Sequence, residues 1–505
     1  MRSAMRVHCR KPLLRLASRL RHGGPIRPVG VCAVVLTALV GLVLGGCKDL
    51  TGSPGLPAGT PNPTFFNTPT GALGMDAAAL GAAQIALQQY VIDAGLLSDE
   101  LEDDDVNASP GALLQNNGVV SDPLDERILP ELPTSSVLDG SLSYVALQNV
   151  RAYAAQALGQ LATYDTAAAA QKTQQALRGE LYALTGYAEI MLADLFCSGV
   201  PLSSYIYQHD FTYAGSSTTQ QVYQAAIAQF DTALTLAQAS DSSQIVYLAA
   251  VGKGRALLDL GQYAAAAQAV AQVPQSFQYQ LDFEYFTYKT HRFDLTGTAP
   301  TTVSNTEGGN GLPYLSNGDP RTAVDTIMTG SFGFPLTFPT RLGGFQATTP
   351  SPLTLADGVE ATLIQAEAAL QATPHTSPTG TDVTWLALLN QLRATAPIPG
   401  TMTPNPTALP PLTDPGAQSS NPDSARVALL FRERAYWLFV TGHRQGDLRR
   451  LLREYRSIWP SQAQVYPVGP YTAPGRGTYG SDVNAPIPPQ ELVNPKFHGC
   501  LDRDP

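Results

Sequence analysis

The densest group of potential ligands in this sequence is an acidic run at residues 97–106, which contains Asp99, Glu100, Glu102 and three successive aspartates from Asp103. Clustered carboxylates are the ligands that hard cations such as Ca²⁺ prefer, so a calcium site over residues 99–105 is one interpretation. The spacing of an EF-hand loop, with its central glycine, is missing. A solvated acidic loop is therefore the favoured interpretation, and the calcium site is the alternative.

Other residues that could bind a metal or act in catalysis lack the spacing that such sites need. Of the five histidines after residue 47, only His498 lies close to another potential ligand, two positions before Cys500. The sequence has no HExxH, paired CxxC, G-x-S-x-G or Walker motif. Its one G-x-G-x-x-G, at 475–480, neither follows a strand pattern nor opens a helix. We therefore expect no metal, no cofactor and no catalysis. A secreted glycosidase remains an alternative, because its two carboxylates need not be near each other in sequence.

The sequence predicts long helices, and these would position any functional site in the chain. Apolar residues recur at three- and four-residue spacing over several segments, with Gln, Arg and Glu between them. The ranges that this periodicity predicts to be helical are 75–93, 143–164, 171–195, 218–239, 245–260, 263–272, 354–372, 382–394, 424–441 and 447–455. Gly254, Gly261, Tyr263 and Ala266 have tetratricopeptide spacing, which places small residues where two helices touch. The sequence predicts an all-α fold of tetratricopeptide-like helical hairpins with long irregular loops and a few short strands.

Residues 274–352 differ from the helical segments on both sides. Gly, Pro, Thr, Ser and aromatic residues replace the helical pattern, and alternate apolar residues from Phe277 to Tyr285 indicate a strand. A Pro- and Thr-rich loop follows at 396–422, and the tail at 457–505 is irregular.

The segment 424–456 contains an amphipathic helix with four arginines at its joint with the next helix, Arg434, Arg444, Arg449 and Arg450. Gly442 is a candidate C-cap for the first helix, and Asp447 is a candidate N-cap for the second. Ion pairs that lock the two helices together are the favoured role of the arginines, with ligand contact as the alternative.

The N-terminus predicts export. Residues 1–28 are basic, residues 29–44 are an apolar run too short for a stable membrane span, and small residues precede Cys47. This order resembles a bacterial lipobox, so we expect a signal peptide at 1–46, a lipid on Cys47 and a tether to residue 70. Residue 48 is Lys rather than Asp, which favours the outer membrane, with exposure at the cell surface.

Charge and cysteine content agree with this compartment. Removal of residues 1–46 leaves 23 basic and 41 acidic residues, which argues against a nucleic-acid partner. Only Cys197 and Cys500 then remain as thiols. An even pair in an oxidising compartment predicts a disulfide between them.

Several short motifs resemble the signature of the SusD/RagB family of outer-membrane nutrient-binding lipoproteins. The matching residues are Asp319-Pro320-Arg321, the helix from Glu360 to Ala369, Glu433-Arg434, Gly442-His443-Arg444, Asp447-Leu448-Arg449-Arg450, Tyr479-Gly480, Asp482-Val483, Pro486-Ile487-Pro488, Glu491 and Asn494-Pro495. Two positions depart from the family pattern, because Trp437 and Thr441 stand where glutamates are often found. The departures put some of the family's ion pairing in doubt, but not its fold.

The resemblance implies a SusD-like ligand-binding domain over 71–505. Its parts are tetratricopeptide-like helices at 143–272, a loop-rich region at 274–352, C-terminal helices at 354–456 and an irregular tail. It also implies binding of an oligosaccharide or a peptide without catalysis, and a SusC-like TonB-dependent transporter as partner. Aromatic rings suit the apolar faces of sugars, so Tyr285, Tyr288 and Tyr314 are the candidate ligand residues, although core or loop packing is the favoured interpretation of each. A lipid-anchored tetratricopeptide-type scaffold for outer-membrane protein assembly is the main alternative function.

Overall fold

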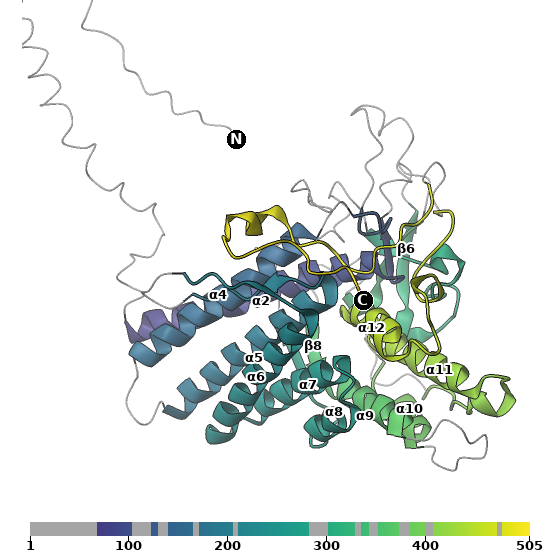
Figure 1. Ribbon diagram of the computed structural model, residues 1–505. Helices are drawn as coiled ribbons and strands as arrows, with labels where there is room; N and C mark the ends of the chain where they lie inside the picture. The colour runs from purple at the N-terminus through teal and green to yellow at the C-terminus, as the bar shows by residue number, and fades with distance from the viewer. Residues whose placement is uncertain are drawn as a thin grey trace, which may run out of the picture. The chain divides into compact units, whose positions relative to one another are not determined.

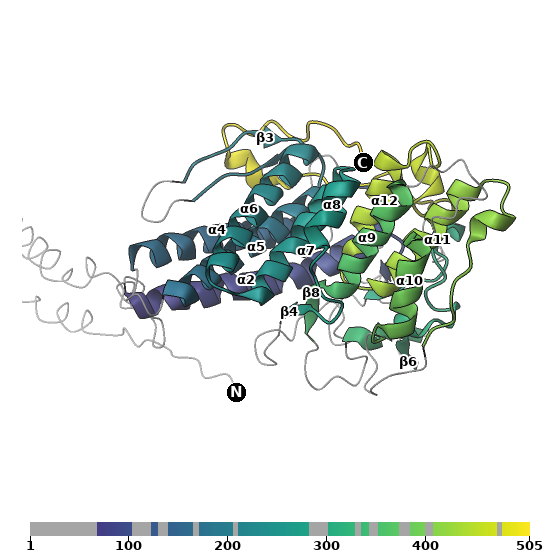
Figure 2. The same ribbon diagram turned by 90° about the horizontal axis from the view of Figure 1, so that it is seen from below.

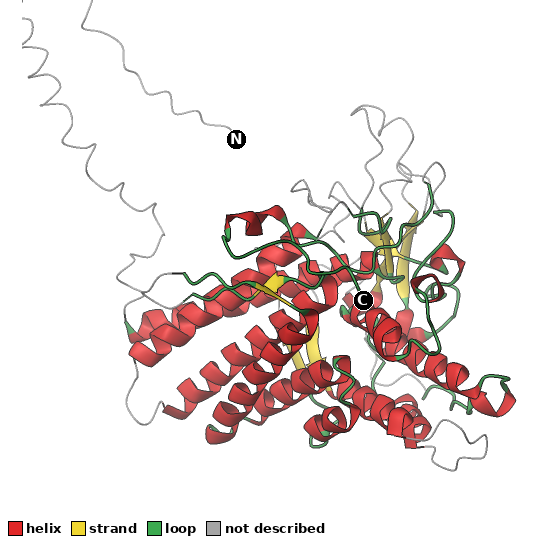
Figure 3. Ribbon diagram, viewed as in Figure 1, coloured by secondary structure: helices red, strands yellow, loops and turns green. Residues whose placement is uncertain are grey.

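Ten α-helices and four two-stranded sheets make up the described part of the chain (Figures 1 and 3). The computed structural model describes residues 68–103, 123–129, 140–164, 171–205, 211–281, 301–328, 335–342, 352–372, 384–398, 408–471 and 477–505. These residues belong to one compact unit, Thr64–Pro505. The predicted signal peptide and Cys47 therefore lie outside the described residues.

Helices that follow one another in sequence pack side by side through most of the chain. They are α2 (Pro69–Leu97), α4 (Ser141–Thr163), α5 (Gln171–Leu195), α6 (Thr219–Ala239), α7 (Ser243–Asp259), α8 (Tyr263–Val270), α9 (Gly358–Ala372) and α10 (Thr384–Thr395). Each contacts the next, and Figure 2 shows α7, α8, α9 and α10 as neighbours. This succession of hairpins confirms the all-α, tetratricopeptide-like fold that the sequence predicts.

Glycines allow the helices to approach closely. A Cβ atom on Gly252 would lie 2.3 Å from the ring of Phe230, and one on Gly186 would lie 2.7 Å from the same ring. Gly254 meets Val270 in the same way, at 2.5 Å, and Ala266 beside it is fully buried. Small residues thus lie where helices touch, as the spacing predicts.

The strands form four antiparallel pairs. The pairs are β1 (Leu101–Asp103) with β5 (Thr301–Val303), β2 (Val200–Pro201) with β3 (Ser216–Ser217), β4 (Gln278–Leu281) with β8 (Leu353–Asp357), and β6 (Val324–Met328) with β7 (Pro335–Pro339). β4 confirms the first part of the strand predicted from the alternation, with Tyr279 and Leu281 buried and Gln278 and Gln280 exposed. The rest of that predicted strand lies outside the described residues.

Several predicted helix boundaries are wrong, and the helix predicted over 75–93 extends from Pro69 to Leu97. The helix predicted from residue 354 begins at Gly358, because Leu353–Asp357 pair with β4 as strand β8. Asp357 then accepts a hydrogen bond from the backbone N–H of Glu360 at 2.7 Å and ends the strand in a helix cap.

Two further boundaries differ at the arginine-rich joint, the end of one helix and the start of the next. Helix α11 (Pro422–Trp437) ends four residues early, and α12 (His443–Glu454) begins directly after Gly442, whose φ is +81°. Gly442 is therefore the N-cap of α12 rather than a C-cap of α11, and Asp447 lies within α12 rather than at its start.

The C-terminal tail runs back over the first helices, as the yellow segment in Figure 1 shows. A hydrogen bond holds its 3-10 helix Pro489–Val493 against α4, because the hydroxyl of Tyr144 donates to the carboxylate of Glu491 at 2.8 Å. The other short 3-10 helices are Glu307–Gly309, Pro320–Thr322, Thr340–Leu342, Pro415–Gln418 and Gln462–Gln464. Among the described helices, none is long and apolar enough to cross a membrane.

Candidate functional site

The signature arginines of α11 and α12 form a buried ion-pair network. Arg434 binds both carboxylate oxygens of Asp447 at 2.8 Å. Arg450 binds both oxygens of Glu367 in α9 at 2.9 Å and also reaches Asp447 and Asp259. We call these five residues the arginine joint; each is at most 3% exposed. Burial by itself would raise the pKa of Asp447, but the two guanidinium groups lower it well below its usual value.

Two more signature arginines tie distant segments to this joint. Arg444 binds Asp99 at the end of α2, with its Nη2 atom 2.8 Å from the carboxylate. Arg321 binds Glu433 in α11 at 2.7 Å and Asp319 at 2.7 Å. These contacts give the Asp-Pro-Arg, Glu-Arg and Gly-His-Arg motifs a structural role and make them poor candidates for ligand contact.

Arg449 differs from the ion-pairing role that the sequence predicts. Its Nη1 atom donates to the carbonyl oxygens of Asp194 at 2.9 Å and of Phe196 at 3.0 Å, and also to that of Ala193. These carbonyls end helix α5, where the helix dipole favours a cation. Arg449 thus caps α5 from a neighbouring helix.

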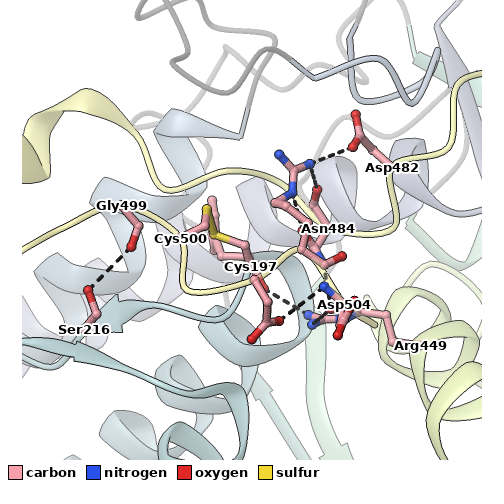
Figure 4. The surroundings of a disulfide bond; sticks show 11 residues. Cys197, Ser216, Arg449, Asp482, Asn484, Gly499, Cys500 and Asp504 are labelled. Atoms are coloured by element: carbon pink, nitrogen blue, oxygen red, sulfur yellow. Dashed lines mark hydrogen bonds and ion pairs between the residues drawn. A yellow bond between two sulfur atoms is a disulfide. The ribbon is translucent and has the colours of Figure 1, made fainter.

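A disulfide fixes the tail beside this cap (Figure 4). Cys197 and Cys500, the pair for which the sequence predicts a bridge, are joined with their Cα atoms 5.8 Å apart. Next to the bridge, the backbone N–H of Leu501 donates to the carbonyl of Ser198 at 2.7 Å, and the amide of Asn484 donates to that of Asp504 at 2.9 Å. A disulfide and hydrogen bonds therefore attach the tail to the helical half.

The acidic run is not a solvated loop in its first part, which corrects the sequence interpretation. Asp99 is fully buried in its pair with Arg444, and Glu100 is 1% exposed and accepts a hydrogen bond from the N–H of Val440 at 2.9 Å. Residues 104 and 105 lie outside the described residues, and no group of three or more metal-ligating side chains occurs among those described. The calcium interpretation of 99–105 gains no support from Asp99, whose oxygens are already occupied.

Only one of the three predicted aromatic ligand residues is described. Tyr285 and Tyr288 lie outside the described residues. Tyr314 is fully buried and stacks on Phe439 with ring centroids 5.3 Å apart, while Tyr436 packs edge-on at 5.9 Å. A ring covered by other rings has no face for a sugar, so the prediction for Tyr314 is wrong.

A cavity of about 600 Å³ beside strand β4 is the better candidate. Its size lies within the range of about 300–1,000 Å³ typical of small-molecule sites. It is lined from five separate segments: the turn and strand β4, the 3-10 helix Thr340–Leu342, strand β8, the end of α10 and the turn between α11 and α12. Its lining includes Gln275, Phe277, Gln278, Gln280, Arg341, Thr354, Asp357, Thr395, Trp437, Val440 and Thr441.

The cavity has an apolar floor and a polar rim. Phe277, Trp437 and Val440 in the floor are at most 5% exposed, whereas Gln278, Gln280 and Thr395 at the rim are exposed. Trp437 and Thr441, the two departures from the family pattern, both line it. Sequence reasoning missed this site, and the two departures were the signal that could have located it.

Comparison with known proteins identifies the fold. No family model matches the sequence, and no curated protein matches it. A SusD superfamily protein from Bacteroides thetaiotaomicron is 13% identical, with a TM-score of 0.53 over 85% of this chain and 100% of that one. A putative sugar binding protein from Bacteroides vulgatus is 14% identical, with a TM-score of 0.55 over 86% and 99%.

NanU from B. fragilis is 10% identical, with a TM-score of 0.55 over 88% of this chain and 98% of that one. The chain therefore has the SusD-like fold, as the motifs predict. At these identities the likeness establishes the fold alone.

Proposed function

We propose that this protein is an outer-membrane lipoprotein that binds an oligosaccharide or a peptide and delivers it to a SusC-like TonB-dependent transporter. The observation that carries the proposal is the SusD-like fold, which extends over 98–100% of the neighbouring structures. One of these neighbours is described as a putative sugar binding protein, which makes an oligosaccharide the first ligand to test.

The arrangement of the described residues favours binding rather than catalysis. The buried carboxylates of the arginine joint are engaged by guanidinium groups. The described lining of the cavity beside β4 offers amides, hydroxyls, Arg341, Asp357 and an apolar floor. An apolar floor with a few polar groups is the combination that orients and holds a small ligand.

Membrane attachment is the part of the proposal that Cys47 would provide. Expressed with residues 1–46, the wild-type protein should sediment with the outer membrane, and mass spectrometry should find a lipid on Cys47. The variant Cys47→Ser should remain unprocessed or soluble. A mature N-terminus at another residue would contradict the lipoprotein assignment.

Ligand and partner are tested on the full mature chain. Affinity purification from the native outer membrane should recover a TonB-dependent transporter, and a glycan and peptide array should show saturable binding without breakdown of the ligand. Release of shorter saccharides by the purified protein would instead favour a glycosidase. Absence of both a transporter and a ligand would overturn the proposal.

A further inference from the structure

Among the described residues that line the cavity beside β4, Arg341 is the one cation. Its Nη1 atom donates to the carbonyl oxygen of Trp437 at 2.7 Å. Within the described part of the chain, no carboxylate lies within ion-pair distance of this guanidinium. Arg321, Arg434, Arg444 and Arg450 each have at least one such partner. A guanidinium has five N–H donors, so Arg341 keeps most of its donors available.

The two acids that act on Arg341 through their charge, Asp357 and Glu100, each accept a hydrogen bond from a backbone N–H. Asp357 accepts from the N–H of Glu360 at the start of α9, and Glu100 accepts from the N–H of Val440. Burial raises the pKa of both carboxyl groups, that of Glu100 to about 8. Burial also lowers the pKa of Arg341, but a guanidinium stays charged at neutral pH. Asp357 also lines the cavity but lies outside ion-pair distance, so Arg341 has no direct counter-ion among the described residues.

The rim supplies neutral hydrogen-bonding groups. In β4 the alternation that buries Tyr279 and Leu281 turns Gln278 and Gln280 to the cavity side. Among the described residues, the side-chain amides of these two glutamines have no hydrogen-bond partner. Amides that can both donate and accept suit a ligand rich in hydroxyl groups.

We propose that this cavity binds an anionic sugar unit, a saccharide ring carrying a carboxylate or a sulfate, with the anion on Arg341 and the ring hydroxyls on Gln278 and Gln280. The inference rests on the proposed function, because it names the class of ligand that the binding protein takes. A guanidinium binds either anion through paired, charge-assisted hydrogen bonds.

Because the chain is negatively charged overall, any preference for an anionic ligand depends on a local cation such as Arg341. The protein carries a net charge of −10, so its long-range field repels anions. A preference for anionic over neutral sugars must then come from a local contact. Removal of that one contact should abolish the preference rather than only weaken it.

The first experiment is an array of defined carboxylated, sulfated and neutral oligosaccharides, followed by titration calorimetry of each bound anionic probe and its neutral form. The neutral forms are the methyl ester of the carboxylate and the desulfated sugar. We expect the wild type to bind an anionic member ~10-fold or more tightly than its neutral form. The carboxylated and sulfated arms distinguish the two sources of the anion.

The variant Arg341→Gln should bind both forms about equally, and Arg341→Lys should retain part of the preference because it keeps the charge. Gln278→Ala should weaken the anionic and neutral forms to the same extent. The matched control is Lys172→Gln, which removes one positive charge at an exposed ion pair with Asp241 and should change nothing. Circular dichroism checks that each variant is folded.

Three results would overturn the inference: binding of neutral sugars alone, binding of peptides alone, or an anionic preference that survives in Arg341→Gln. Each of them leaves nutrient binding itself intact. A protein that binds no sugar and no peptide would refute the proposed function as well, so the two failures are distinguishable.

Discussion

The arginine joint and the neighbouring cavity use the same side chain in opposite ways. In the joint, Arg434 and Arg450 are buried against Asp447, Glu367 and Asp259, and every guanidinium meets a carboxylate. In the cavity, Arg341 has a backbone carbonyl as its partner. A buried charge is tolerated where it is paired, so full pairing indicates a role in holding helices together. An arginine with spare donors beside a cavity is available for a ligand.

The largest expected effect would come from breaking the joint. Arg450→Ala removes the guanidinium that forms ion pairs with Glu367, Asp447 and Asp259, and all three carboxylates are buried. Removal of one partner from a buried pair destabilises a protein by about 3–5 kcal/mol, because a charge is left uncompensated. Urea unfolding followed by circular dichroism should show this loss.

An exposed ion pair provides the control for that experiment. Lys253→Ala breaks the pair with Asp231, whose side chain is 53% exposed. Surface pairs contribute about 0–1 kcal/mol, so this variant should unfold close to the wild type. Equal losses in the two variants would mean that the joint contributes no special stability.

The next effect concerns a region held by a covalent bond rather than by charge. The double variant Cys197→Ser with Cys500→Ser removes the bridge between residues 303 positions apart. We expect unfolding free energy to fall by about 2–4 kcal/mol, since the unfolded chain gains freedom. The tail contacts of Asn484 and Leu501 should persist in the folded state. Thiol labelling of unreduced, denatured wild type should find no free cysteine in the mature chain, and labelling of both residues would exclude the bridge.

The sequence predicted the frame of the molecule far better than its site. Periodicity located the helices because each buries one face locally. It placed the start of α9 four residues early, because β8 forms through pairing with a distant strand. Tyr314 lies in the loop-rich region and was a candidate ligand residue, but Phe439 and Tyr436 cover it, in agreement with the packing interpretation. The cavity could not be predicted, since its lining extends from Gln275 to Thr441 and comes together only in the fold.

A smaller effect should separate two buried carboxyl groups by their response to pH. The Arg434 and Arg450 guanidiniums overcome burial and lower the pKa of Asp447. Its contribution to stability is therefore present above the unfolded pKa of about 3.9, and is lost as pH falls further.

Burial raises the pKa of Glu100 to about 8. Its folded form binds protons more tightly than the unfolded form, so stability should fall as pH rises from about 4.3 to 8.

The variant Glu100→Gln isolates the second of these groups. Between pH 5 and 8 the wild type should lose on the order of 1–3 kcal/mol relative to the variant, which cannot ionise at this position. Unfolding curves at several pH values would measure the difference. A constant difference across this range would show that Glu100 titrates near its ordinary pKa.

The smallest effect is expected from Arg341→Gln, and it is the sharpest test of the comparison. The variant loses one hydrogen bond, to the carbonyl of Trp437, which is worth about 0.5–1.5 kcal/mol. It also removes a charge that the wild type must keep in a partly buried wall without an ion-pair partner among the described residues, which offsets part of that loss. We therefore expect a change in unfolding free energy below about 1 kcal/mol, against about 3–5 kcal/mol for Arg450→Ala. If Arg341→Gln destabilised the protein as strongly as Arg450→Ala, Arg341 would be part of the structural network, and its charge would not be free for a ligand.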